Sequence, residues 1–295
     1  YTTPLAGVHL GAIVQAAVAG AAHRSTLSRR QKCDTPMTTT ASPCPTPPRL
    51  AYALTEPGRF VIEINRLLLA HPFLRRARGG DGHPVMVLPG FLGADGSTAA
   101  LRYYIANWGY DTHGWAMGRN LGLRAEDPEF ENRLAERLGT LVRKSGRKVS
   151  LVGWSLGGVL ARELARACPD HVRQVITLGS PIGGDPKATT IWRVYELATE
   201  TELHSEELRQ RVAQIVQPVP GVPCTAIYSR SDGIVSHQIA RERETPLTDN
   251  IRVVASHVGL GFSATVLHAI ADRLAQDEHD WRPFRRTCWR RIFYA

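Results

Sequence analysis

The sequence predicts an α/β fold, in which helices cover both faces of a mostly parallel central sheet. Short apolar runs rich in β-branched residues alternate with stretches of helical periodicity from residue 84 to residue 276. Two of these runs, 149–152 and 172–178, are typical of strands that are buried on both faces. A glycine-rich turn then joins the first of them to a helix. Because strands alternate with helices, one parallel sheet is favoured.

The elements before this turn follow in a regular order. Apolar positions at helical spacing over residues 56–77 predict a helix that leads into the domain. PVMVL predicts a buried strand over 84–88, followed by the loop 89–93. The chain should then form a helix over 98–108, a strand over 112–117, and a helix over 127–144 that begins at Asp127-Pro128.

The turn itself is Gly153-Trp154-Ser155-Leu156-Gly157-Gly158, which fits the pattern G-x-S-x-G. In such a nucleophile elbow, the serine sits in strained backbone geometry between a strand and a helix. Glycines on both sides remove the Cβ atoms that would collide there. A lone match of this pattern is weak, but here a strand precedes it and a helix follows it. Ser155 is therefore the candidate nucleophile.

After the elbow helix, VRQVITL predicts a strand over 172–178. Residues 182–222 then interrupt the alternation as a small helical cap insertion, with helices expected near 189–198 and 205–216. A cap would wall a pocket with its apolar residues, although a simple packed excursion explains the pattern as well. Strands over 225–228 and 250–254 and a helix over 263–276 complete the domain. The apolar residues of the insertion are Ile191, Trp192, Val194, Leu197, Val212, Ile215 and Val216.

The net charge of +9 is concentrated at the two ends of the chain. Residues 1–50 contribute +4 and residues 281–295 contribute +5, so residues 51–280 are neutral on balance. A nucleic-acid enzyme should carry basic residues along its working surface, so no nucleic-acid partner is expected. The five cysteines are widely spaced and form no C-x-x-C pair, which favours neither a metal site nor a disulfide framework. Cys168 and Cys224 are expected to be packing residues.

The two terminal segments differ from the body. Residues 1–50 are excluded from the predicted fold, as a degenerate leader or as sequence upstream of a start at Met37, and disorder is expected there. The run 5–22 is too polar for a confident membrane span. The tail 281–295 alternates arginines with aromatic residues. It is expected to pack its aromatics on the domain, with weak contact to a membrane surface as the alternative. Compartment and oligomeric state stay open.

A serine nucleophile needs a histidine base and an orienting carboxylate, and on this kind of sheet the chain order is serine, acid, histidine. This chain order excludes six histidines that lie before Ser155 or before the strand 172–178. His204 is set aside because it lies in the insertion. Of the four that remain, only His257 lies in a loop directly after a strand, where parallel-sheet enzymes expose functional groups. Asp232 follows the strand 225–228 and is the candidate acid, with Asp185 as the alternative. The excluded residues are His9, His23, His71, His83, His113 and His171.

An acyl-transfer reaction also needs two N–H donors for the developing oxyanion. One is the backbone N–H of Leu156, directly after the nucleophile. The other is expected from the loop after the strand 84–88, where Phe91 is the candidate and Leu92 the alternative. Both donors act through the backbone.

Residues 84–280 resemble the α/β-hydrolases, and VMVLPGFLG, GWSLGG and SDGIV are similar to motifs of the lipase/esterase branch. The resemblance implies hydrolysis of carboxylic esters, including lipid esters, through an acyl-serine and without cofactor or metal. It also implies acyl transfer to an alcohol as an alternative, since relatives with a Pro-Gly oxyanion loop are acyltransferases. The chain departs from the common pattern at Trp154, where many relatives have histidine, and at Pro89-Gly90, which replaces His-Gly. A third hypothesis is a binding protein of this fold without catalysis, which an intact set of Ser155, Asp232 and His257 disfavours.

Overall fold

The computed structural model describes residues 45–77, 79–122, 129–184, 188–189, 206–286 and 290–294. All of them belong to the compact unit Pro45–Ala295. The first of the two helices expected in the insertion, the start expected for the helix over 127–144, and Asp185 lie outside the described residues. So do Cys33, Cys44 and Cys288.

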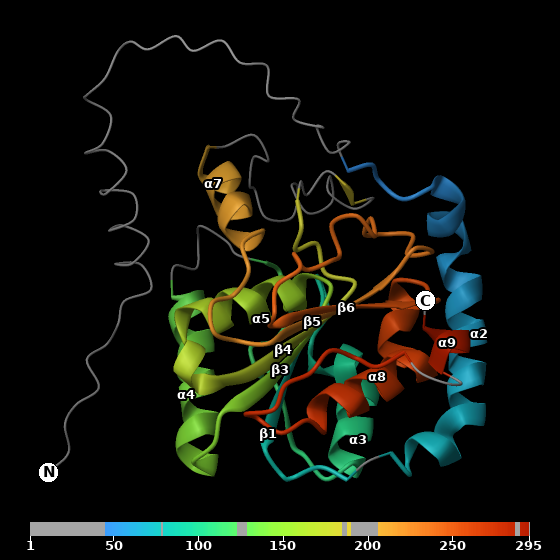
Figure 1. Cartoon of the computed structure of the whole chain (residues 1–295). Coiled ribbons are helices and arrows are strands. Elements are labelled where there is room, and N and C mark those ends of the chain that lie inside the picture. The colour runs from blue at the N-terminus through green and yellow to red at the C-terminus, as the bar shows by residue number, and fades with distance from the viewer. Residues whose placement is uncertain are drawn as a thin grey trace, which may run out of the picture. The chain divides into compact units, whose positions relative to one another are not determined.

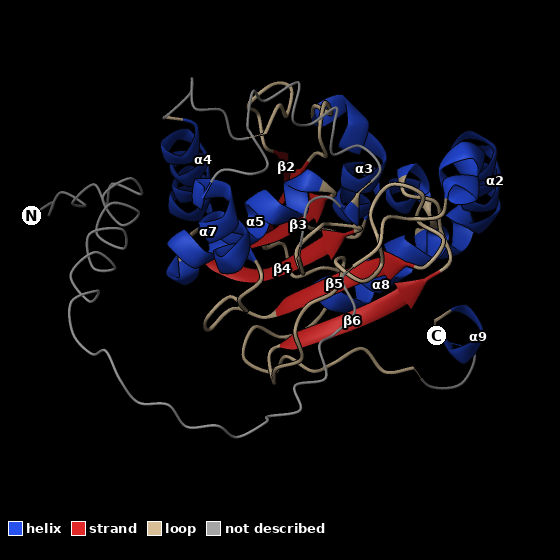
Figure 2. Cartoon of the chain, turned by 90° about the horizontal axis from the view of Figure 1, so that it is seen from above, coloured by secondary structure: helices blue, strands red, loops and turns tan. Residues whose placement is uncertain are grey.

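The centre of the fold is a six-stranded sheet in which every pair of neighbouring strands is parallel, in the order β2-β1-β3-β4-β5-β6 (Figures 1 and 2). The predicted mostly parallel sheet is confirmed. The chain runs from β1 to one edge and then crosses to β3 on the other side of β1. Parallel sheets expose ligand sites at such a reversal, beyond the carboxyl ends of the strands. The strands are β1 (Pro84–Leu88), β2 (Asp111–Gly114), β3 (Val149–Trp154), β4 (Val172–Leu178), β5 (Cys224–Ser229) and β6 (Thr248–Val253).

Helices cover both faces of the sheet, as Figure 1 shows. On one face lie α4 (Phe130–Ser145) and α5 (Leu156–Ala167), and on the other lie α3 (Ala99–Asn107) and α8 (Ala264–Leu274). Outside α8 runs the long helix α2 (Leu50–Leu74), which begins six residues before its expected start at residue 56. Shorter elements are the helices α7 (Glu206–Ile215) and α9 (Arg290–Phe293) and the 3-10 turns η1 (Asp95–Thr98), η2 (Pro169–His171) and η4 (Val258–Phe262).

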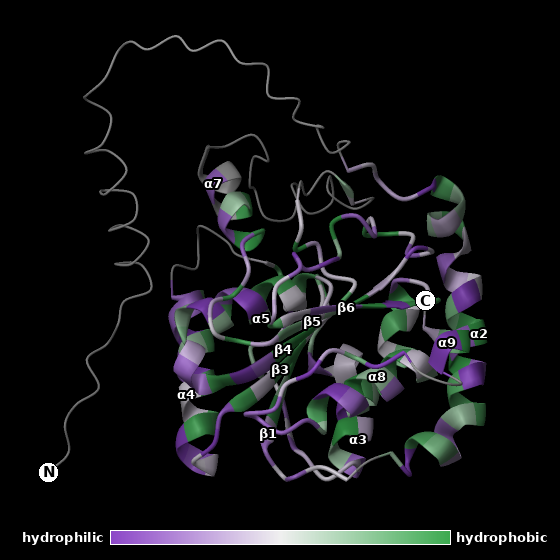
Figure 3. Cartoon of the chain, viewed as in Figure 1, coloured by the Kyte–Doolittle hydropathy of each residue, from purple (hydrophilic) through white to green (hydrophobic). Residues whose placement is uncertain are grey.

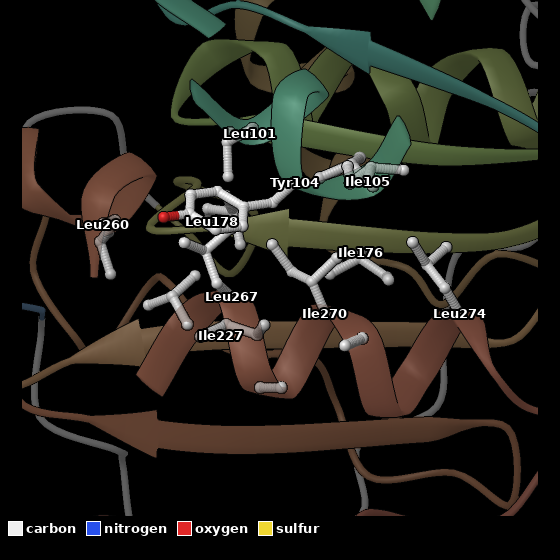
Figure 4. Close-up of a cluster of buried hydrophobic side chains, with 14 of the residues drawn as sticks. Leu101, Tyr104, Ile105, Ile176, Leu178, Ile227, Leu260, Leu267, Ile270 and Leu274 are labelled. Carbon is white, nitrogen blue, oxygen red and sulfur yellow. The ribbon is translucent and has the colours of Figure 1, made fainter. Parts of the chain in front are cut away.

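Alternate residues of the buried strands face opposite layers, as the period of two requires. Val85 and Val87 of β1 pack toward α3 and α8, whereas Met86 and Leu88 pack toward α4 and α5. Figure 4 shows the first of these layers, in which α3 and α8 place side chains over β4 and β5. Leu260 of η4 reaches the same cluster. The residues labelled there from the helices and strands are Leu101, Tyr104, Ile105, Ile176, Leu178, Ile227, Leu267, Ile270 and Leu274.

One predicted element is shorter than expected. β2 ends at Gly114, although the apolar pattern suggested a strand to residue 117. The carboxylate of Asp95 accepts the backbone N–H groups of Trp115 and Ala116 at 3.0 and 3.1 Å, and these N–H groups are therefore not used by the sheet. Ala116 also has a positive φ of 60°, which ends extended backbone.

The two described ends of the predicted insertion are tied to α5. Ile215 of α7 packs against Val159 and Ile182. The buried guanidinium of Arg162 donates to the carbonyls of Ile215 and Gln217 and forms an ion pair with the equally buried Glu242, with Nη2 and Oε2 2.8 Å apart. This group of contacts holds the base of the insertion against the elbow helix.

The two cysteines expected to pack are described. Cys224 is fully buried at the start of β5, where burial raises the pKa of its thiol, and Cys168 is half-buried beside the core. In the tail, Phe284 and Tyr294 are buried while Ile292 and Phe293 are exposed, so its apolar side chains are divided between the domain and solvent. Within the described residues, no helix is long and apolar enough to cross a membrane.

Candidate active site

The elbow forms between β3 and α5, with Ser155 at its tip. Ser155 has φ 53° and ψ −122°, a strained conformation for a residue with a side chain. A Cβ atom on Gly153 would collide with the backbone of Gly157, and one on Gly157 would collide with the Leu88 carbonyl. Only glycine allows β1, β3 and α5 to approach so closely. The sequence pattern thus folds locally into the predicted strand–turn–helix.

The structure brings Asp232 and His257 together from two loops that follow β5 and β6. His257 Nδ1 and Asp232 Oδ2 lie 2.7 Å apart, and both side chains are buried. The other carboxylate oxygen, Oδ1, accepts the backbone N–H groups of Ile234 and Val235 at 2.8 and 2.7 Å. The carboxylate is therefore held in one orientation, with Oδ2 directed at the imidazole.

Burial is the largest single influence on the imidazole and disfavours its charged form, but the negative charge of Asp232 and two smaller effects together outweigh it, so the pKa of His257 is raised above its ordinary value. The hydrogen bond to Asp232 and the charge of Glu56 act in the same direction. A histidine paired in this way can take a proton from a neighbouring hydroxyl and be stabilised as the imidazolium.

The Asp232–His257 pair and the elbow meet at the end of β4. The backbone N–H of Ser155 donates to the carbonyl of Leu178, and a Cβ on the next residue, Gly179, would lie 3.0 Å from Asp232 Oδ2 and 3.3 Å from His257 Nδ1. The indole N–H of Trp154 donates to the His257 carbonyl at 3.3 Å. The departure from the common motif at Trp154 thus has a structural role, because this indole ties the elbow to the histidine loop.

Between the described side chains of Ser155 and His257 there is no hydrogen bond. In serine hydrolases this contact is often long until substrate binds, so the proximity of the two loops is the relevant observation. At 9% exposure, the Ser155 side chain lies just below the surface.

The loop after β1 runs against the elbow. A Cβ on Gly90 would lie 3.2 Å from the Ser155 Cβ. Leu92 has a φ of 61°, and its N–H donates to the Asn120 carbonyl at 2.7 Å, so the alternative oxyanion donor is engaged within the protein. Phe91 lies between these two residues. Leu156 begins α5, where a backbone N–H has no acceptor within its own helix, and the helix dipole favours negative charge there.

Asn120 is a residue that the sequence did not single out. Its fully buried side chain donates to the Pro89 carbonyl at 2.7 Å and accepts the Gly122 N–H at 3.0 Å. Its backbone accepts from Leu92 and donates to the Gly93 carbonyl at 2.7 Å. Asn120 thus holds both ends of the loop that carries Phe91. A single asparagine in a polar loop gives no signal of this role.

Two buried carboxylates of α2 support the histidine loop from behind. Glu56 Oε1 accepts the backbone N–H groups of Gly233 and His257 at 2.8 and 2.9 Å, and Oε2 accepts that of Val258 at 3.1 Å. One side chain therefore joins the loop that carries Asp232 to the loop that carries His257. Glu56 also pairs with Arg59, which donates to the carbonyl of Ser231 at 2.5 Å.

Glu63, two turns further along α2, accepts both the backbone N–H and the hydroxyl of Ser256 at 2.6 Å. Burial raises the pKa of Glu63, and the bonds to Ser256 act against this effect. The sequence gives no signal of either role, because a charged residue within a helical pattern normally indicates a solvated face.

A second Ser-His-Asp arrangement occurs where β1 and β3 begin. His83 Nε2 lies 2.8 Å from the Ser150 hydroxyl, and His83 Nδ1 lies 2.5 Å from Asp81 Oδ1. Ser150 and His83 are both completely buried, and Asp81 is also paired with Arg147 and Arg173. No substrate can reach this serine, so we assign the arrangement to structure. Among the described residues, no group of His, Cys, Asp and Glu is arranged to hold a metal ion.

A parallel sheet with this strand order, with a serine turn after β3 and an acid–histidine pair after β5 and β6, is typical of the α/β-hydrolase fold. Residues 92–258, more than half of the chain, match the family model described as "PGAP1-like alpha/beta domain", and the chain belongs to this family. The family match and the strand order both assign the chain to the α/β-hydrolase fold.

Several solved structures are similar to the chain at low sequence identity. Aspergillus fumigatus lipase B is 19% identical with a TM-score of 0.52, over 68% of this chain and 55% of that one. An α/β-hydrolase from the sediment metagenome of the Mar Chica lagoon, Morocco, is 22% identical with a TM-score of 0.44, over 62% and 85% of the two chains. A Saccharomyces cerevisiae monoglyceride lipase is 12% identical with a TM-score of 0.48, over 68% and 88%. A search of curated proteins found no match.

Proposed function

We propose that the protein hydrolyses carboxylic esters through an acyl-serine intermediate. The observation that carries the proposal is the hydrogen-bonded pair of Asp232 and His257 next to Ser155, a serine with positive φ at the start of a helix. Substrates are esters of apolar acyl groups, including lipids. This part of the proposal is supported by the apolar residues of the insertion, of which Ile215 packs against the same buried cluster as Leu156.

In the first half-reaction, the Ser155 hydroxyl attacks the ester carbonyl and His257 takes its proton. Asp232 holds the imidazole in the tautomer that leaves Nε2 free to accept. The oxyanion is stabilised by the N–H groups of Leu156 and Phe91. The intermediate collapses as the C–O bond to the alcohol breaks, and the imidazolium gives its proton to the leaving alcohol.

In the second half-reaction, His257 takes a proton from water, which attacks the acyl-serine. Collapse of the second tetrahedral intermediate releases the carboxylic acid and returns the proton to Ser155. An alcohol in place of water would give a new ester, and this is the acyltransferase alternative. Both outcomes use the same residues.

A panel of p-nitrophenyl esters of increasing acyl length tests the proposal. Ser155→Ala should lower kcat by several powers of ten, because it removes the nucleophile. Ser150→Ala is the matched control, since it removes the hydroxyl of the buried serine–histidine pair. It should keep turnover and lose only stability, by about 1–3 kcal/mol.

The panel also separates the alternatives. Adding an acceptor alcohol and measuring ester product against free acid distinguishes transfer from hydrolysis. Turnover that is unchanged in Ser155→Ala would refute the proposed catalytic role of Ser155 and favour a binding protein of the same fold.

A further inference from the structure

Helix α2 departs from the usual surface polarity, because it buries Glu56 and Glu63 together with Leu67 and Leu74 and exposes many of its other apolar side chains. A helix on the outside of a globular domain normally buries its apolar face and exposes its charges. In α2 the only two acidic residues, Glu56 and Glu63, are buried, at 6% and 7% exposure. The outward face is apolar. Seven large apolar side chains of α2 are more than half exposed, and we call this set the α2 stripe: Leu50, Leu54, Val61, Ile62, Leu68, Leu69 and Phe73.

The members of the α2 stripe form one continuous face. They recur at spacings of one, four and seven residues, as the side chains on one side of a helix do. The 25 residues of α2 extend over about 37 Å at 1.5 Å per residue. Figure 3 shows apolar residues recurring along the whole helix, at the edge of the molecule. Exposed apolar side chains gathered in this way mark an interaction site.

The exposed charges of α2 and of the turn that follows it are all positive. Arg66, Arg75 and Arg76 are exposed, and within the described residues none of them has an ion-pair partner. Arg66 lies along the stripe, and the other two lie at its C-terminal end. Since both acids of α2 face inward, the exposed charges of this helix are all positive, and its other exposed polar side chains, Thr55 and Asn65, are neutral.

The apolar surface continues onto the C-terminal tail. Between α2, α8 and α9 lies a groove of about 570 Å³, lined by residues that include Phe73, Arg76 and Phe293. Ile292 of α9 is 79% exposed beside it, and Arg291 accompanies it in the same short helix. The end of α2 and the tail thus form one apolar surface bordered by arginines and by Asp272, which pairs with Arg290.

We propose that the α2 stripe is a docking surface for an anionic lipid bilayer. Apolar side chains that enter the boundary between head groups and acyl chains, with arginines beside them at the phosphates, are what an interfacial helix requires. Charge complementarity favours this occupant over a second copy of the chain. A copy packed through the same face would bring no carboxylate from α2 to the arginines.

This surface is directly connected to the candidate active site. The inward face of α2 bonds through Glu56 and Glu63 to the loop of His257. A bilayer on the α2 stripe would therefore lie about one helix diameter, roughly 10 Å, from that loop. The docking itself does not depend on the chemistry proposed for Ser155, and its test needs no substrate.

Co-sedimentation of the full chain with vesicles tests the proposal. We expect binding to phosphatidylcholine vesicles that contain phosphatidylglycerol, weaker binding to pure phosphatidylcholine, and a decrease with salt because the arginine contribution is screened. Leu68→Gln/Leu69→Gln should lower partitioning onto both kinds of vesicle at least tenfold, because two exposed leucines no longer enter the bilayer. Far-UV circular dichroism and the thermal midpoint confirm that this variant is folded.

The arginines have a matched control in α4, which lies on the other face of the sheet. Arg75→Gln/Arg76→Gln should lower partitioning onto the anionic vesicles roughly tenfold and leave the neutral ones unchanged. Arg143→Gln/Lys144→Gln removes the same charge from exposed positions of α4 and should change neither. No sedimentation with anionic vesicles, or equal losses in both charge variants, would overturn the proposal. So would a dimer in analytical ultracentrifugation that the leucine substitutions abolish while vesicle binding persists.

Discussion

Glu56 is the residue whose replacement best tests how the catalytic loops are held. Its carboxylate accepts three backbone N–H groups from the two loops and one bond from Arg59. Glu56→Gln keeps the size of the side chain, but its amide must turn an NH₂ group toward one of these donors. The change loses one charge-assisted bond and weakens the others, for a total of about 3 kcal/mol.

Stability and turnover should both respond. A loss of about 3 kcal/mol corresponds to a decrease in Tm of roughly 6–12 °C for a domain of this size. Because misplacement of a catalytic group by about 1 Å can cost 100-fold, we expect kcat to fall roughly 10- to 100-fold. Differential scanning fluorimetry and initial rates on a short ester measure the two effects.

The pH profile separates this role from a merely structural one. His257 acts as a base when neutral, so activity rises as pH increases through its pKa. The charge of Glu56 helps to raise that pKa, and its removal should therefore move the acid limb of the kcat/KM profile to lower pH. Glu63→Gln is the matched control, because it removes a carboxylate that bonds to Ser256 and does not contribute to the pKa of His257. An unshifted limb in Glu56→Gln, or an equal shift in both variants, would refute the reasoning.

Three further substitutions have expected outcomes. Asp232→Asn should lower kcat about 10⁴-fold. The amide oxygen should stay with the two backbone N–H groups, so that the NH₂ group faces His257 and imposes the wrong tautomer of the imidazole. Steady-state kinetics should show the lower kcat, and the Tm should be unchanged. Asn120→Ala should lower kcat roughly 10- to 100-fold with little change in KM, since it releases the oxyanion loop, and an increase confined to KM would contradict it. Arg162→Met should cost about 3–5 kcal/mol in urea unfolding by leaving Glu242 buried and unpaired, and adding Glu242→Leu should recover most of the loss.

Much of the sheet could be predicted from the sequence because buried parallel strands leave a strong local pattern. β1 and β4 have the expected bounds, since PVMVL and VRQVITL are apolar runs of strand length between turns. The elbow was recognisable because its glycines are required by close approach of three backbones, which is a local demand. The chain order of a serine, an acid and a histidine, together with the position of a loop directly after a strand, then reduced eleven histidines to one candidate.

What the sequence could not indicate depends on distant contacts. Glu56 bonds to residues about 180–200 positions away, and nothing near it reveals that this face of α2 is turned inward. Asn120 holds a loop thirty-one residues before it through its side chain. The early end of β2 likewise follows from Asp95, twenty residues upstream. In each case the partner is set by tertiary structure, and neither periodicity nor composition reports it.

The buried serine–histidine–aspartate set at the start of β1 and β3 has a consequence for chemical labelling. Judged by hydrogen-bond partners alone, Ser150 would be as good a candidate nucleophile as Ser155, since Ser150 is the one that directly contacts an imidazole. Access separates them: one hydroxyl is sealed beneath the helices, and the other lies at the tip of a turn. A fluorophosphonate reagent should therefore modify the chain at a single serine, and peptide mapping of the adduct would identify which end of the sheet is chemically competent.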